Sequence, residues 1–130
     1  MLFTDRDIQK VSNDVMNMLH DDEVEVINEL HDALVAKDIE KIDELLKQVI
    51  SEMEVHFKTE EDMMADANYP NLGMHKSDHD FIRAKLEKFA KRWDILKSPS
   101  ELKGFFDKEF KRWYTQHITK WDTQTAIALD

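Results

Sequence analysis

Cysteine is absent from this 130-residue chain, which excludes disulfide bridges, thiolate metal ligands and nucleophilic thiols. Glycine and proline occur only twice each, too rarely to supply the turns that hairpins and β-sandwiches need. Hydrophobic residues still make up 42% of the chain, enough for a packed interior. The sequence therefore predicts an all-α fold, with residues 1–130 forming a single domain around one core.

Positive charge is also scarce, because 18 lysines and arginines face 28 acidic residues and leave a formal net charge of −10. This excess repels the phosphates of nucleic acids and anionic membrane surfaces, so we expect neither as a partner. No apolar run approaches the roughly 20 residues that span a bilayer. The start, Met1–Asp7, lacks the basic and apolar regions of a signal peptide, and we expect a cytoplasmic protein.

Four amphipathic stretches repeat apolar residues every three or four positions, which is typical of helices with one buried face. They predict helices over about residues 12–36, 39–67, 71–97 and 100–127, preceded by a short N-terminal arm of about residues 1–11. Asp38 is a suitable N-cap for the second helix, and either Ser98 or Ser100 could cap the fourth. Pro70 cannot extend the preceding helix. Short connections favour antiparallel neighbours, so the prediction is an up-down-up-down four-helix bundle.

Five of the six histidines and two carboxylates fall into these stretches at spacings suited to metal binding. They are His20, His56, Glu60, His75, His79, His117 and Asp122. Residues four apart share a helix face, as in His56–Glu60 and His75–His79. His117 and Asp122 are five apart, which leaves them about 140° apart on an ideal α-helix. A carboxylate that bridges two metals could tolerate this offset by approaching from the side.

The predicted topology brings these seven side chains together at one end of the bundle. They lie early in the first and third helices and late in the second and fourth. A single histidine on an apolar helix face is usually a core residue. Burying five imidazoles and two carboxylates without a cation would be costly, however, so the joint pattern indicates a metal site.

The kind and number of ligands favour two metal ions over one. Imidazole and carboxylate suit iron, zinc, copper or nickel, whereas structural zinc prefers four closed ligands and often cysteine. Two six-coordinate irons offer about twelve positions. Five imidazoles, two bridging carboxylates and a bridging oxygen would leave about one position open. An open position on a redox metal suits a small diatomic ligand.

These fragments resemble the hemerythrin family in its bacterial form, and the resemblance covers nearly the whole chain. The matching residues are His20, His56-Phe57-x-x-Glu60-Glu61, Tyr69-Pro70, His75-x-x-x-His79 and Trp113-x-x-x-His117-Ile118-x-x-x-Asp122. The resemblance implies two iron ions without haem, joined by an oxo or hydroxo bridge, and reversible binding of O2 at one iron.

The resemblance also assigns roles to the individual residues. It implies one iron held by His75, His79 and His117, and a second iron held by His20 and His56. It makes Glu60 and Asp122 the bridging carboxylates. It implies that the O2 pocket is lined by Phe57, Trp113 and Ile118.

Three positions depart from the family pattern, which usually has glutamine before the first histidine, leucine three residues after it, and leucine after the pocket tryptophan. Here they are Leu19, Glu23 and Tyr114. Either the helix rolls so that Glu23 reaches solvent, or its carboxyl lies beside the open iron position and bonds to Tyr114. There Glu23 could coordinate iron, hold a water or donate a proton. Tyr114 could instead serve packing alone.

Three functions follow from these patterns. The first is O2 binding for storage, delivery or scavenging. The second is a di-iron enzyme that activates O2, peroxide or nitric oxide, with Glu23 and Tyr114 as candidate catalytic residues. The third is an oxygen or redox sensor that acts through a separate partner. The sequence leaves open whether the protein is an enzyme. We expect His31 to be structural or exposed, and Glu61 to be solvated.

Overall fold

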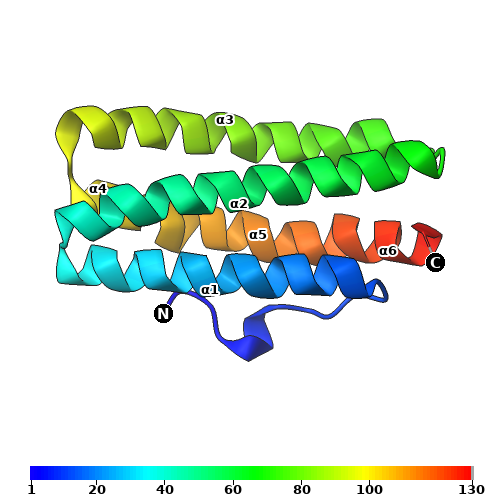
Figure 1. Ribbon diagram of the computed structural model, residues 1–130, viewed down its shortest axis with the longest axis horizontal. Coiled ribbons are helices and arrows are strands. Elements are labelled where there is room, and N and C mark those ends of the chain that lie inside the picture. Colours follow the sequence, from blue (N-terminus) through cyan, green and yellow to red (C-terminus); the bar gives the residue numbers. More distant parts are fainter. Residues whose placement is uncertain (130) are drawn as a thin grey trace.

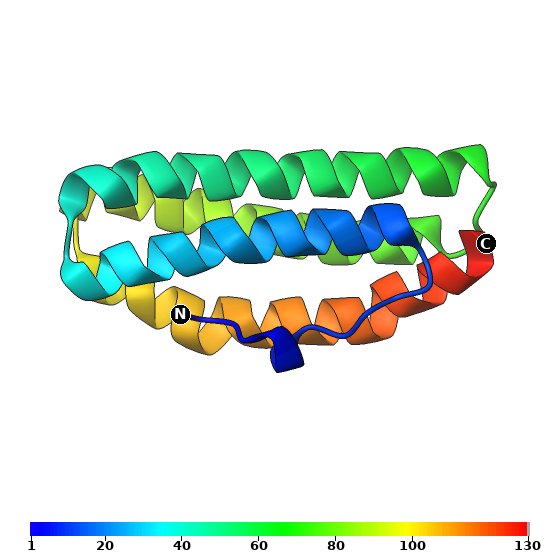
Figure 2. The same cartoon turned by 60° about the horizontal axis from the view of Figure 1, so that its bottom comes forward.

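The computed structural model describes residues 1–129, and the predicted all-α fold class is confirmed. The first three long helices are α1 (Asp14–Ala36), α2 (Ile39–Asp66) and α3 (Leu72–Leu96). The fourth is one continuous rod made of α4 (Pro99–Phe105), η2 (Phe106–Phe110), α5 (Lys111–His117), η3 (Ile118–Asp122) and α6 (Thr123–Leu129). Neighbouring rods run antiparallel, and the two views agree on a four-rod bundle (Figures 1 and 2).

The helix ends follow from local capping chemistry. The side chains of Asn13, Asp38 and Ser98 accept hydrogen bonds from backbone N–H groups in the first turns of α1, α2 and α4. At their other ends, α1 and α3 stop at Lys37 and Lys97, which adopt left-handed backbone angles with φ of 57° and 46°. The observed helix limits differ from the expected ones by no more than two residues.

The N-terminal arm packs along α1 and α5 instead of extending into solvent (Figure 2). Leu2 and Phe3 are buried, and the Phe3 ring lies 5.2 Å from that of Tyr114 on α5. Asn28 on α1 holds this segment, because its side-chain oxygen accepts from the N–H groups of Leu2 and Phe3 and its amide donates to the carbonyl of Phe3. The arm therefore covers one side of the bundle core.

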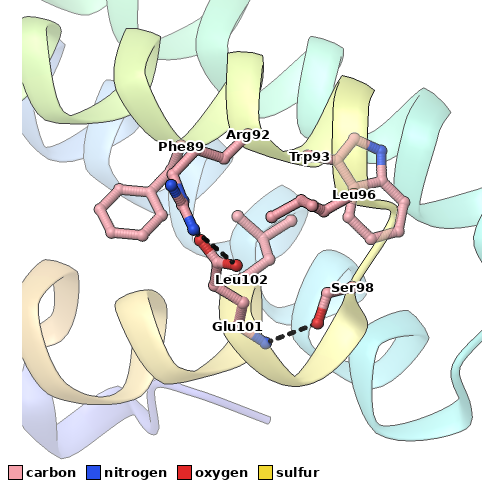
Figure 3. A pocket seen from close by; sticks show the side chains of 7 residues that line it. All are labelled: Phe89, Arg92, Trp93, Leu96, Ser98, Glu101 and Leu102. Carbon is pink, nitrogen blue, oxygen red and sulfur yellow. Dashed lines mark hydrogen bonds and ion pairs between the residues drawn. The ribbon is translucent and has the colours of Figure 1, made fainter.

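The bundle end where α3 turns into α4 is closed by packing and a few polar contacts (Figure 3). Arg92 pairs with Glu101, and the Ser98 hydroxyl accepts from the Glu101 N–H. The small cavity beneath these residues has a volume of about 10 Å³, barely enough for one water. This end has a structural role. In the described part of the chain, no helix is both long and apolar enough to cross a membrane.

Candidate metal centre

The seven side chains predicted as metal ligands converge at the opposite end of the bundle. There α1 and α3 begin and α2 and the fourth rod end (Figure 1). Each of the seven residues is at most 2% exposed to solvent. The topology therefore buries five imidazoles and two carboxylates in one small volume.

Their donor atoms form two overlapping groups, in each of which all atoms lie within 4.8 Å of one another. One group is Glu60, His75, His79, His117 and Asp122. The other is His20, His56, Glu60 and Asp122. Both carboxylates belong to both groups, and each histidine belongs to one.

Glu60 divides its two oxygens between the groups. Its Oε1 lies 3.2 Å from the Nε2 atoms of both His75 and His79. Its Oε2 contacts the Nε2 of His56 on the other side. Because α2 carries both His56 and Glu60 one turn apart, a single helix supplies one imidazole and one bridging position.

Asp122 divides its oxygens in the same way. Its Oδ1 lies 3.0 Å from the Nε2 atoms of His75 and His117, and its Oδ2 lies 2.8 Å from the Nε2 of His20. Each carboxylate thus presents one oxygen to each group, which is the arrangement that a pair of bridged cations requires.

A π-helical turn explains the five-residue spacing between His117 and Asp122. Across η3 the N–H of Thr123 donates to the carbonyl of Ile118, an i+5 bond instead of the α-helical i+4. The extra residue in this turn brings His117 and Asp122 onto the same side of the rod. The expectation of an ordinary α-helix with a sideways approach of the Asp122 carboxylate is therefore wrong.

Four of the five clustered histidines are also held from behind through their Nδ1 atoms. The pairs are His56 with Glu23 at 2.6 Å, His75 with Thr125 at 2.7 Å, His79 with Glu61 at 2.8 Å and His117 with Asp78 at 2.6 Å. Metal-binding imidazoles typically donate their second ring N–H to such a partner, which fixes the ring and directs the other nitrogen at the metal.

The close approach of the inner nitrogens suits a cation. The Nε2 atoms of His75 and His117 are 3.2 Å apart, and Asp122 Oδ1 accepts no hydrogen bond although both lie near it. Asp78 can only accept from His117, so Nδ1 keeps its proton and the inward-facing Nε2 is the nitrogen that would exchange its proton for a metal. A metal–nitrogen bond of about 2.1 Å places adjacent ligand atoms about 3 Å apart. The residues therefore fit a metal centre.

The electrostatics point the same way. Burial disfavours the charged form of His117, but the carboxylates of Asp122 and Asp78 outweigh it and raise the pKa of His117 to about 9. Burial is likewise outweighed at His56, whose pKa rises well above its usual value because Glu23 and Glu60 lie beside it. The pKa of Asp122 falls well below its usual range despite burial, because of His117 and the other imidazoles. The cavity therefore favours positive charge at His56 and His117, which protons supply when no metal is bound, whereas burial lowers the pKa of His79.

Glu23 is buried, at 2% exposure, so the alternative in which it reaches solvent is wrong. One of its oxygens accepts from Nδ1 of His56 at 2.6 Å and the other from the Tyr114 hydroxyl at 2.7 Å. Glu23 therefore lies behind His56 and belongs to neither group of inward-facing donor atoms. Tyr114 makes a specific polar contact in addition to its packing.

Two of the three residues expected to line a ligand pocket stack on imidazoles of the cluster. Phe57 stacks on His79 with ring centres 4.2 Å apart, and Trp113 stacks on His117 at 4.6 Å. Phe57 and Ile118 are buried, and Trp113 is half-buried. Phe57 and Trp113 thus give the cluster aromatic neighbours.

Three outer partners were missed or misread in the sequence. Glu61, expected to be solvated, instead accepts from His79 and pairs with Arg83, and its side chain is 16% exposed. Asp78 lies on a different helix from His117, so no sequence spacing indicates that the two side chains bond. Thr125 lies one turn beyond Asp122 on the same helix face, a signal that could have revealed it. His31 has a structural role, since its Nε2 bonds to Asp107 at 2.7 Å.

Comparison with known proteins decides the family, because residues 11–126 match the Hemerythrin HHE cation binding domain. The chain belongs to the hemerythrin family. It is 36% identical over 129 residues to a bacteriohemerythrin of Aquifex aeolicus, covering 99% of this chain and 98% of that protein. A bacteriohemerythrin of Pseudomonas aeruginosa is 31% identical over 116 residues, covering 88% of this chain and 73% of that protein.

Solved structures support the hemerythrin fold independently of sequence. A crystal structure of a hemerythrin mutant with leucine replaced by tyrosine superposes with a TM-score of 0.80 at 21% identity. The match covers 99% of this chain and 96% of that one. The hemerythrin resemblance drawn from the sequence is thus confirmed. All seven residues of the His, Glu and Asp cluster fall within the matched cation-binding domain.

Proposed function

We propose that this hemerythrin-family protein holds two iron ions and binds O2 at one open position. The observation that carries the proposal is the pair of donor groups that share both Glu60 and Asp122. His75, His79 and His117 would complete the site of one iron. His20 and His56 would complete the site of the other.

The two groups differ in how many donors they offer. Five protein donors and a bridging oxygen fill an octahedral ion, whereas four donors and the same oxygen leave one position open. The open position therefore belongs to the group that contains His20 and His56. When bound there, ferrous ions supply the electrons that a dioxygen ligand needs. The apolar side chains of Phe57, Trp113 and Ile118 limit the access of water and protons.

The test begins with iron content and then measures O2 binding. The purified protein should carry about two irons per chain after loading with ferrous ion, since the cluster supplies two sites. Asp122→Asn should lose both irons, because Asp122 serves both groups. Asp62→Asn, an exposed change on the same bundle end, should keep them. Reduced protein given O2 should develop a visible absorption band that disappears when oxygen is removed.

A single iron per chain, or none, would contradict the dinuclear proposal. Two irons per chain without a reversible O2 absorption band would contradict O2 binding but would leave the dinuclear site in place.

The buried Glu23–Tyr114 pair supports a second candidate, a di-iron enzyme that activates O2, peroxide or nitric oxide. A carboxyl and a phenol hydrogen-bonded to each other behind a histidine of the cluster form a polar group that simple carriage does not require. This candidate predicts rapid, irreversible oxidation of the reduced protein by O2 and turnover of added peroxide. Retention of a stable, reversible O2 band would contradict it.

A further inference from the structure

The bonds around Glu23 hold a proton on Nδ1 of His56. Tyr114 donates its hydroxyl proton to one Glu23 oxygen at 2.7 Å, so Glu23 acts there as an acceptor. The other oxygen lies 2.6 Å from Nδ1 of His56. A carboxylate can only accept, so Nδ1 of His56 donates. The other ring nitrogen, Nε2, faces the cluster and contacts the Glu60 carboxylate, where a bound metal would take the place of the Nε2 proton.

The donor group of His20, His56, Glu60 and Asp122 is the two-histidine group, and that of His75, His79 and His117 with the same carboxylates is the three-histidine group. His20, the other imidazole of the two-histidine group, has no carboxylate bonded to its Nδ1 atom. Its Nε2 faces Asp122 at 2.8 Å, but its Nδ1 is buried with no hydrogen-bond partner among residues 1–129. The two imidazoles of the group with the open position are therefore unequal. Nδ1 of His56 faces a buried carboxylate, whereas Nδ1 of His20 has no hydrogen-bond partner in the described part of the chain.

We propose that Glu23 is a positioning residue that makes His56 the dominant imidazole donor of the two-histidine group and biases that position toward the ferric ion. The inference rests on the proposed di-iron function and deepens it. A carboxylate behind a metal-bound imidazole fixes its ring and raises its basicity. A more basic donor favours the higher charge of ferric over ferrous ion. Glu23 thus acts through His56 without touching the metal.

Tyr114 completes the arrangement. Its ring is 1% exposed and stacks on Phe110, with centroids 5.6 Å apart, so its hydroxyl is held in place. That hydroxyl occupies the second oxygen of Glu23 and keeps the carboxylate from turning away from His56. The chain Tyr114–Glu23–His56 therefore links α5, α1 and α2 directly to one metal position.

The chain offers a matched control at the other metal position. Glu61 accepts from Nδ1 of His79 at 2.8 Å, just as Glu23 accepts from His56, but His79 belongs to the three-histidine group. Glu23→Gln and Glu61→Gln therefore make the same chemical change behind one imidazole of each group. Their effects should fall on different metal sites.

The first experiment titrates the metal-free protein with Co2+ and follows its visible absorption. Wild-type protein should bind two ions. We expect Glu23→Leu to weaken the ion at the two-histidine group by about 10- to 100-fold, with Glu23→Gln intermediate, while the three-histidine group keeps its affinity. Glu61→Gln should show the reverse selectivity. Equal weakening of both ions in the Glu23 variants would indicate general structural damage and overturn the inference.

The second experiment measures the reduction potentials of the iron-loaded variants. If Glu23 favours ferric over ferrous ion about tenfold, Glu23→Gln should raise one of the two potentials by about 59 mV. Glu61→Gln should shift the other. An unchanged potential in Glu23→Gln would overturn the inference even if the variant folds normally. Failure of the wild-type protein to bind two ions of cobalt would instead overturn the proposed function itself.

Discussion

At the scale of single residues, the cluster is organised in two layers that differ in how far sequence reveals them. The inner ligands recur at helical spacings, so residues such as His56 and Glu60 can be predicted from the chain. The outer partners Glu23 and Asp78 come from other turns or other helices. Which side chain lies behind which imidazole depends on how the helices pack, and spacing along one helix does not encode that. Glu23 stands out in the sequence because it departs from the leucine that the family pattern usually has at this position.

The Tyr114 hydroxyl should contribute measurably to stability. Tyr114→Phe leaves one oxygen of the buried Glu23 without a donor, which should lower the free energy of unfolding by about 1–3 kcal/mol. Denaturant unfolding of the metal-free protein measures this. Tyr69→Phe, at a half-buried position in the exposed loop after α2, is the control and should change stability by less than about 0.5 kcal/mol. Similar losses in both variants would show that the Glu23 contact contributes nothing.

At the scale of elements, the fourth rod differs from the other three because it contains two π-helical turns. In η2 the N–H of Lys111 donates to Phe106, and Asp107 in that turn bonds to His31 on α1. In η3 the widened turn places Asp122 beside His117. The positions of the helices were predictable from apolar periodicity, but these turns were not. A π turn adds one residue without adding an apolar or capping signal.

The η3 turn gives a sharp test with a deletion. Removing the exposed Thr119 should convert the π turn into an ordinary α-helical turn and keep Asp122 and Thr125 on their present face. We therefore expect the variant to bind two metal ions per chain, as measured by metal analysis. Inserting an alanine after Thr119 should instead rotate Asp122 by about 100° and abolish binding. Loss of both ions in the deletion variant would contradict this account of the turn.

For the N-terminal arm, the sequence predicted the position in the chain but not the contacts that hold it against the bundle. Residues 1–11 were expected to precede the first helix, but their docking through Asn28 depends on contacts across 25 or more positions. Asn28→Ala removes three hydrogen bonds and should lower the unfolding free energy by about 1–3 kcal/mol. It should also speed hydrogen exchange at the N–H groups of Leu2 and Phe3. Asn71→Ala, whose side chain caps nothing, is the control. Unchanged exchange would mean that Asn28 does not hold the arm.

At the scale of the whole molecule, the two ends of the bundle differ: one is packed with aromatic side chains and the other holds the buried His, Glu and Asp cluster. Stacked and edge-on phenylalanines, including Phe89, Phe105 and Phe106, fill the end away from the cluster. The other end buries charged and titratable groups that stabilise the fold only when a cation balances them. Fold class and helix order followed from composition and periodicity because they depend on local patterns. The charge balance of the cluster depends on distances between helices and had to come from the structure.

This balance predicts that stability depends on pH differently with and without metal. In the metal-free protein the pKa of His117 is raised to about 9, from about 6.5 when unfolded. A raised pKa adds stability below the unfolded value, and that contribution is lost as the pH rises through the folded value. The metal-free protein should therefore lose roughly 3 kcal/mol of unfolding free energy between pH 6.5 and 9, a range set by the unfolded and folded pKa.

Bound metal should remove this loss, because the cation takes the place of the imidazolium protons and binds more tightly as competition from protons falls. Thermal unfolding of metal-free and cobalt-loaded protein across that pH range measures both curves. The gap between them should widen with pH. His31→Asn, outside the cluster, should keep the wild-type slope, whereas His117→Gln should flatten the metal-free curve. A metal-free protein whose stability rises toward pH 9 would show that the buried carboxylates do not demand positive charge, and the electrostatic case for the metal centre would fail with it.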